Sequence, residues 1–195
     1  GMAAFFTALF GTPLAATVFA MMVISVGVFY HADFIPCLVA SLVAFGVSIL
    51  MGVAPTRFAV AAPDLTALML LRVAGLAALC GLVASLFCHS VHFAERKMRS
   101  LLPNPWVRVA VGGAAVVLLT LAVGSQTYNG AGMRTISAAI EGGAAPAFGF
   151  LLKILFTAIT LGAGFKGGEV VPSFFVGATF GCVVGPLLGI PAGFA

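Results

Sequence analysis

The chain has 195 residues, of which 62% are apolar and only 7% are charged, and its mean hydropathy is +1.22. A water-soluble domain carries about 25% charged residues, so this sequence has too few charges to cover a soluble surface. The apolar runs are as long as helices and do not alternate, which favours helices over a β-barrel. We therefore predict an all-α, multi-pass integral protein of the cell membrane.

The net charge of +4 does not indicate a nucleic-acid partner. Four of the nine basic residues lie close together in and beside a break between two apolar runs: Arg96, Lys97, Arg99 and Arg108. Clustered Lys and Arg next to membrane helices set topology by facing the cytoplasm. We therefore expect the segment 95–108 to be cytoplasmic and no nucleic acid to be bound.

The first part of the chain contains three long apolar runs. Residues 11–29 predict a helix that starts at Thr12-Pro13, because proline suits a first helical turn. After a polar break at 30–33, residues 34–52 predict a second helix. A third opens at Pro63-Asp64 and continues to Arg99, roughly 54 Å of helix at 1.5 Å per residue. This length exceeds a perpendicular span, so we expect the third helix to be tilted or to emerge from the bilayer.

Further along, Pro103-Asn104-Pro105 breaks the chain, and residues 107–123 predict a fourth helix with Trp106 at the membrane interface. The composition then becomes polar and glycine-rich. We expect an irregular connection followed by a short helix within residues 124–143.

Two short apolar helices, 147–161 and 171–188, are predicted on either side of a glycine-rich loop. Irregular backbone at membrane depth is tolerated only where it lines a cavity or is buried in protein. The N–H groups at a helix N-terminus carry partial positive charge and can hold a small anion. Main-chain anion contacts are therefore predicted, with Lys166 and Pro172 in support, at Gly167, Gly168, Glu169, Val170 and Val171. A structural turn without a ligand is the alternative.

The residues around this break resemble the anion-filter motif of the CLC family of chloride channels and halide antiporters. Residues 164–172 read Gly-Phe-Lys-Gly-Gly-Glu-Val-Val-Pro. The family form is Gly-Gly-x-Phe-x-Pro, followed by a helix of small residues like 174–181. Near the other end of the chain, residues 10–19 resemble the family segment that has a Pro-Leu-Ala-Gly core and ends in Phe-x-x-Glu.

The resemblance implies a CLC-like bundle of tilted and broken helices that moves chloride or fluoride. It also implies a homodimer in the lipid bilayer without a cofactor or a resident metal, and protons are left open as a second substrate. Residues 2–52 would be the end of a first inverted repeat, with two helices at the dimer interface. Residues 53–195 would begin the second repeat and end with the filter loop and its helix. Only the middle of the family domain is matched, because the gating-glutamate segment belongs before Met2 and the closing helix after Ala195.

Three positions depart from the family pattern. Met22 stands where Phe-x-x-Glu would place a glutamate, and Val23 stands beside it, so no proton-relay acid is found there. Val170 replaces the filter phenylalanine, which a main-chain ligand tolerates. Glu169 resembles the acidic position of the fluoride-exporting branch, whose motif is Gly-Gly-Glu-x-x-Pro. That branch tends to have threonine where this chain has Val171.

Several alternatives stay open at this stage. Glu169 is either a functional acid at bilayer depth or a residue that favours the helix start. His89, His92 and Glu95 are spaced at i, i+3 and i+6, where a metal site is the alternative to a polar helix end. A membrane-embedded enzyme is not favoured, because no nucleophile or metal cluster is found. A stable, non-transporting fragment that needs further segments or a partner chain is the alternative to a transporter.

Overall fold

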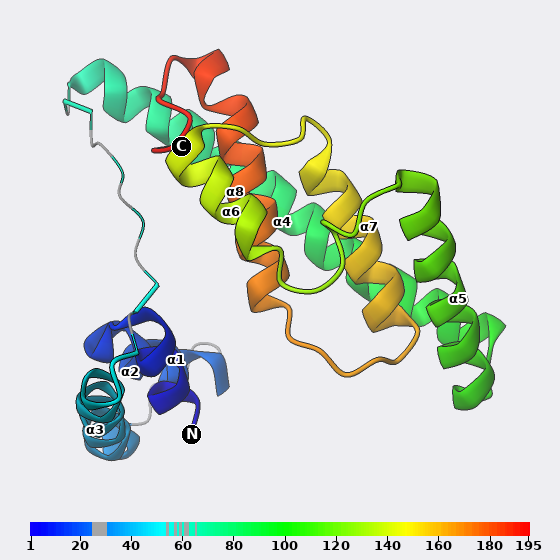
Figure 1. The fold of residues 1–195 in the computed structure, drawn as a ribbon, viewed down its shortest axis with the longest axis horizontal. Helices are drawn as coiled ribbons and strands as arrows, with labels where there is room; N and C mark the ends of the chain where they lie inside the picture. Colours follow the sequence, from blue (N-terminus) through cyan, green and yellow to red (C-terminus); the bar gives the residue numbers. More distant parts are fainter. Residues whose placement is uncertain (25–30, 54, 57, 59, 61–62, 65) are drawn as a thin grey trace. The chain divides into compact units, whose positions relative to one another are not determined.

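The chain folds into helices joined by loops, and in the computed structural model it divides into two compact units, Gly1–Phe58 and Ala59–Ala195 (Figure 1). The structure describes residues 1–24, 31–53, 55–56, 58, 60, 63–64 and 66–195. Over these residues it contains α-helices and short 3-10 helices but no strand, so the predicted all-α class is confirmed. The assignment of residues 2–52 and 53–195 to two inverted repeats stays a prediction.

The first unit contains α1 (Met2–Phe10), α2 (Pro13–Ile24), the 3-10 helix η1 (His31–Asp33) and α3 (Phe34–Leu50). The predicted helix start at Pro13 and the second predicted helix are confirmed. The first predicted run is helical as far as Ile24, and residues 25–30 lie outside the described residues. Helix α1 was not predicted, because its nine residues are too few to cross a bilayer.

Small polar side chains join the helices of the first unit. Gly11 ends α1 with a φ of 67°, and its N–H donates to the carbonyl oxygen of Thr7 at 2.8 Å. The hydroxyl of Thr17 in α2 lies 3.2 Å from that of Ser41 in α3. Thr7, Thr17 and Ser41 are fully buried. The hydroxyls of Thr7 and Thr17 donate to carbonyl oxygens one turn earlier, so both buried hydroxyl groups have a hydrogen-bond partner.

The second unit begins with the two longest helices, α4 (Ala67–Leu101) and α5 (Pro105–Val123). The start of α4 was predicted at Pro63, but it lies later because Thr66 caps the helix: the N–H of Met69 donates to its hydroxyl oxygen at 3.3 Å. Asn104 caps α5 in the same way through the N–H of Trp106.

Three shorter helices complete this unit: α6 (Met133–Gly142), α7 (Gly149–Gly162) and α8 (Val170–Val184), followed by the 3-10 helix η2 (Pro186–Leu188). One apolar helix was predicted over 171–188, but it breaks at Gly185 because Pro186 has no N–H to continue the α-helical ladder.

The core of the second unit lies where α7 and α8 pack against α4. One buried cluster joins Phe87 and Val91 of α4 to Ile154 and Ala158 of α7 and Val176 of α8. A second cluster, near the start of α4, contains Met69, Leu76, Phe180 and Ile190. Because α4 contacts both short helices, it holds α7 and α8 together in this unit.

The two longest helices leave most of their apolar surface exposed. Both α4 and α5 are long and apolar enough to cross a membrane, yet only 11% and 6% of their most apolar windows are buried within the chain. The core helix of a soluble protein is mostly buried instead. This outward apolar surface agrees with the predicted integral membrane protein.

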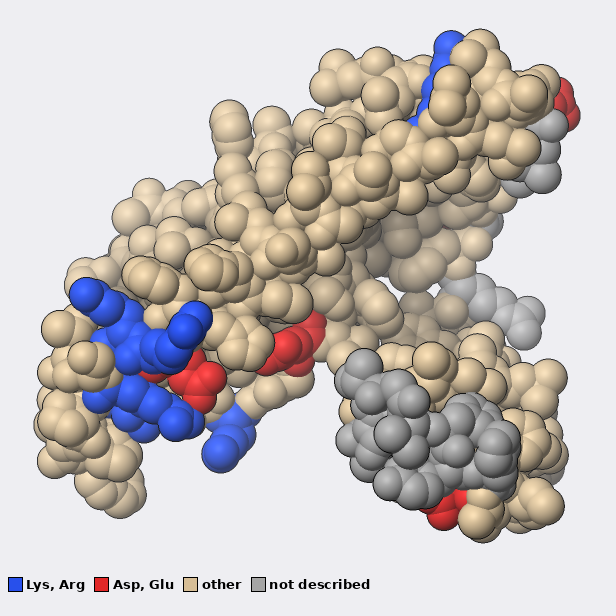
Figure 2. Space-filling model, turned by 180° about the vertical axis from the view of Figure 1, so that it is seen from behind, with Lys and Arg blue, Asp and Glu red and all other residues tan. Residues whose placement is uncertain are grey.

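Charged side chains gather at one end of the second unit. Figure 2 shows blue Lys and Arg atoms concentrated at that end, while most of the remaining surface is tan. The residues Arg96, Lys97 and Arg99 lie in the last turns of α4, and Arg108 lies in the first turn of α5. The guanidinium of Arg99 pairs with Glu95 at 2.6 Å.

Candidate functional site

Two short helices meet at an irregular segment, as the sequence predicted. Helix α7 has 14 residues and ends at Gly162, and α8 has 15 residues and begins at Val170. We call the intervening residues 163–169 the α7–α8 loop. Gly164 adopts a φ of 97°, which favours glycine, and its N–H donates to the carbonyl oxygen of Leu161 at 2.9 Å.

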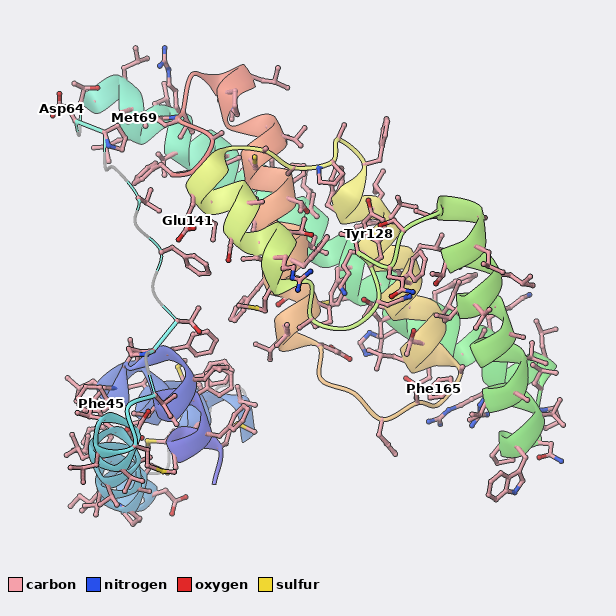
Figure 3. All side chains as sticks on the ribbon, viewed as in Figure 1. Phe45, Asp64, Met69, Tyr128, Glu141 and Phe165 are labelled. Atoms are coloured by element: carbon pink, nitrogen blue, oxygen red, sulfur yellow. The ribbon has the colours of Figure 1, made fainter. Side chains whose placement is uncertain are left out.

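The first part of the α7–α8 loop is held against α5. Arg108 Nε donates to the carbonyl oxygen of Ala163 at 3.3 Å. Gly112 gives Ala163 room, because a Cβ at this glycine would overlap the Cβ of Ala163. Phe165 lies on the α5 side of the loop (Figure 3), in contact range of Gly113. The loop is therefore positioned by a neighbouring helix before it reaches the predicted site residues.

The start of α8 presents main-chain N–H groups that have no protein acceptor. Among the hydrogen bonds of the described residues, none uses a main-chain N–H of residues 167–171 as its donor. The first donor of the helix is Ser173, whose N–H reaches the carbonyl oxygen of Glu169 at 3.0 Å. Pro172 has no N–H and therefore adds no unpaired donor. Such amides, at the positive end of the helix dipole, are suited to hold a small anion.

Glu169 precedes α8 but its carboxylate does not cap the helix. The residue has helical backbone angles, φ −90° and ψ −16°, and its side chain makes no capping hydrogen bond. The side chain is exposed. If this carboxylate stabilises the start of α8, it therefore does so through the helix dipole and not through a capping hydrogen bond.

The predicted site residues line two different hollows. The first, which we call the loop hollow, has a volume of about 490 Å³ and includes Gly167, Gly168, Val171 and Pro172. Facing them are residues 128–131 of the polar connection together with side chains of α7, among them Thr157 and Thr160. The lining of the loop hollow therefore combines apolar side chains with two threonines and the polar connection.

The second hollow, which we call the α4–α8 groove, has a volume of about 400 Å³ and includes Glu169 and Val170. Its remaining lining comes from α4 and α8 and is mostly apolar, with Cys80, Phe87 and Phe180 among the residues. The predicted group of residues 167–171 is therefore brought together in the chain but divided between two sides. Lys166 is exposed and belongs to the lining of neither hollow.

The sequence analysis missed one residue of the loop hollow, Lys153 of α7. Its side chain is only 2% exposed. Its Nζ donates to the carbonyl oxygens of Tyr128 at 3.0 Å and Gly130 at 2.5 Å. Figure 3 labels Tyr128, where the polar connection passes α7. The signal was present in the sequence, because an ionisable residue in the middle of an apolar run indicates function by default.

The metal alternative at the end of α4 is not supported. His92 Nδ1 lies 2.7 Å from the carbonyl oxygen of Cys88, and Glu95 pairs with Arg99. Across the described part of the chain, no three His, Cys, Asp or Glu side chains are grouped so that they could hold a metal ion. This end of α4 is a charged helix terminus.

Comparisons with known proteins show which family this chain resembles. The family described as voltage gated chloride channel matches residues 1–194. A chloride/fluoride channel protein of Pseudomonas syringae pv. tomato (strain ATCC BAA-871 / DC3000) is 34% identical over 202 residues, which cover 99% of this chain and 44% of that protein. A solved structure titled as a CLC-type fluoride/proton antiporter matches with a TM-score of 0.92 and 35% identity, over 100% of this chain and 49% of that one. The chain therefore spans just under half the length of these relatives.

Proposed function

Because the chain belongs to the voltage-gated chloride channel family, we propose that it is the halide-binding middle part of a CLC-type transporter of the cell membrane. The observation that carries this proposal is the start of α8, where Gly167, Gly168 and Val171, whose N–H groups are unpaired, line the loop hollow. Their partial positive charge attracts a halide. No cofactor is needed for such a site.

Fluoride is the favoured halide in this proposal. Fluoride is a small ion and the strongest hydrogen-bond acceptor among the halides, so it gains most from a protonated carboxyl group that donates to it. Glu169 provides a carboxyl group at the residue that directly precedes α8. Both relatives described above carry fluoride in their names. Chloride is the second candidate, since one of these names includes it.

Proton exchange and dimer formation complete the proposal. The antiporter title names protons, and Met22 and Val23 supply no acid at the family position near α2. Glu169, which directly precedes α8, is the acid of this chain that we propose as a proton-linked carboxylate. Exposed apolar side chains on α2, such as Leu14 and Met22, support a homodimer with contacts in the first unit. A non-transporting fragment is less well supported, because the relatives that match nearly all of this chain are named as a channel and an antiporter.

Halide flux from liposomes tests the proposed function. The protein that carries this chain is reconstituted, and efflux of fluoride and chloride is followed with ion-selective electrodes. We expect fluoride efflux faster than chloride efflux, together with proton movement in the opposite direction. Liposomes that release neither halide above the rate of protein-free vesicles would contradict the proposal.

A further inference from the structure

Lys153 is a buried cation without an anionic side chain beside it. It lies in the apolar helix α7 and is 2% exposed. Within the described part of the chain, the one ion pair joins Arg99 and Glu95 at the end of α4. A charge inside the membrane is costly unless it is paired or hydrogen-bonded. The burial of the Lys153 ammonium group therefore needs a structural or functional explanation.

Two of the three ammonium protons are accounted for. They are donated to the carbonyl oxygens of Tyr128 and Gly130 in the polar connection. These bonds satisfy main-chain acceptors in a segment that has no regular structure, which is one structural task for the lysine. Nζ also lies 5.1 Å from the ring centroid of Phe175, whose face stabilises a cation. Neither the carbonyl oxygens nor the ring neutralises the charge.

The remaining donor capacity belongs to the same hollow as the free amides. Lys153 lines the loop hollow together with Gly167, Gly168 and Val171. An ammonium group has three donors and no acceptor, so it can bind an anion but not a cation in this space. The loop hollow therefore joins a fixed positive charge from α7 to the positive end of α8.

From this geometry we propose that Lys153 is the counter-charge of the halide in the loop hollow. This inference rests on the proposed halide function and deepens it. The ammonium group offsets the negative charge of an anion held by the N–H groups of Gly167, Gly168 and Val171, while the two carbonyl bonds keep Nζ in place. Lys153 thus raises halide affinity and excludes cations, whereas the exposed Lys166 contributes little because water screens its charge.

A halide-binding measurement separates this role from a purely structural one. The probes are sodium fluoride and sodium chloride added to the protein in detergent, with sodium gluconate at equal ionic strength as the blank. A ligand that binds the native state raises the thermal midpoint by mass action. The variants are Lys153→Gln, which keeps a hydrogen-bond donor without charge, Lys153→Met, which keeps neither, and the matched loop variant Lys166→Gln.

We expect both Lys153 variants to need at least about tenfold more halide for the same rise in midpoint, since a unit charge is removed close to the anion. Lys166→Gln should follow the wild type. If Lys153→Gln responds to halide like the wild type, the lysine only holds the polar connection in place through its hydrogen bonds, and the inference is wrong. A wild type that shows neither a halide response nor halide flux instead contradicts the proposed function itself.

A second measurement decides the matter if the Lys153 variants do not fold. Lysine ammonium signals of ¹⁵N-labelled protein are followed by NMR during a fluoride titration, and the Lys97→Gln and Lys166→Gln variants remove two of the signals. A Lys153 signal that shifts with fluoride but not with gluconate supports the inference. A Lys153 signal that stays unmoved while the protein binds fluoride overturns it.

Discussion

In the proposed site, the carboxylate of Glu169 and a halide would compete for the same helix end. It directly precedes α8 and makes no capping bond. When ionised, the carboxylate repels an incoming anion; when protonated, it can donate a hydrogen bond to the anion. We therefore expect halide binding to depend on this residue, whatever it contributes to the stability of α8.

Substitution of Glu169 tests this link. Glu169→Gln should change fluoride and chloride flux and remove most of their dependence on pH, whereas Glu169→Asp keeps a titrating group and should change them less. Liposome flux at two pH values, normalised to folded protein, measures both effects. Equal fluxes for Glu169→Gln and the wild type would contradict a functional role of the Glu169 side chain. Only the proposed anion contacts of the loop main chain would then remain.

The sequence predicted the candidate site from a local motif, but it did not predict which residues surround this site in three dimensions. The glycine-rich break and Glu169 were predicted because both are visible as a local pattern. Lys153 was missed because its significance depends on the carbonyl oxygens of Tyr128 and Gly130, more than 20 residues away along the chain. The division of residues 167–171 between two hollows likewise depends on packing with α4 and α7.

At the scale of elements, the contact between α5 and the α7–α8 loop determines where the loop starts. Gly112 allows Ala163 to approach closely, whereas a Cβ at the neighbouring Gly113 would make an ordinary contact with Phe165 at 3.6 Å. The two glycines thus form a matched pair, since replacement by alanine gives both the same gain in helix propensity.

We expect Gly112→Ala to destabilise the protein by about 1–3 kcal/mol through overpacking and to reduce halide flux. Gly113→Ala should retain both stability and flux. Thermal unfolding in detergent and liposome flux provide the two readouts. Similar free energies of unfolding for the two variants would mean that Ala163 moves away from α5 without destabilising the protein.

Helix boundaries were predictable wherever a local signal sets them. Pro13 and Gly124 lie at helix ends that the sequence predicted, because proline and left-handed glycines act locally. Helix α5 begins at Pro105, two residues before the predicted start, because Asn104 caps it. The break at Gly185 was missed because apolar composition continues across Pro186. Helix α1 was missed because a short apolar segment needs tertiary contacts, here with α2 and α3, to form a stable helix.

At the scale of the whole molecule, the charged end of α4 predicts the orientation in the membrane. The segment 95–108 should face the cytoplasm, because four of the nine basic residues lie there. Ser100 is exposed in this segment. Ser100→Cys should therefore resist an impermeant thiol reagent in intact cells and react after permeabilisation, relative to the parent protein. Rapid labelling of this cysteine from outside intact cells would show that the predicted orientation is wrong.

Dimer formation through the first unit is testable at Met22, which is 58% exposed within the chain. Met22→Glu would place an unpaired carboxylate in an apolar interface, and we expect it to weaken the dimer by at least about tenfold. Met22→Leu keeps volume and polarity and should leave dimers intact. Cross-linking and mass measurement in detergent report the dimer fraction. An unchanged fraction for Met22→Glu would move the interface away from this residue.

The placement of residues 167–171 between the loop hollow and the α4–α8 groove has a thermodynamic consequence. Gly167, Gly168 and Val171 line the loop hollow, whereas Glu169 and Val170 line the α4–α8 groove. Binding free energies at two sites are reciprocally linked. If protonation of Glu169 strengthens halide binding by some factor, the halide must strengthen proton binding by the same factor. Neighbouring residues on one short segment can therefore couple two ions directly, without a conformational signal that crosses the molecule.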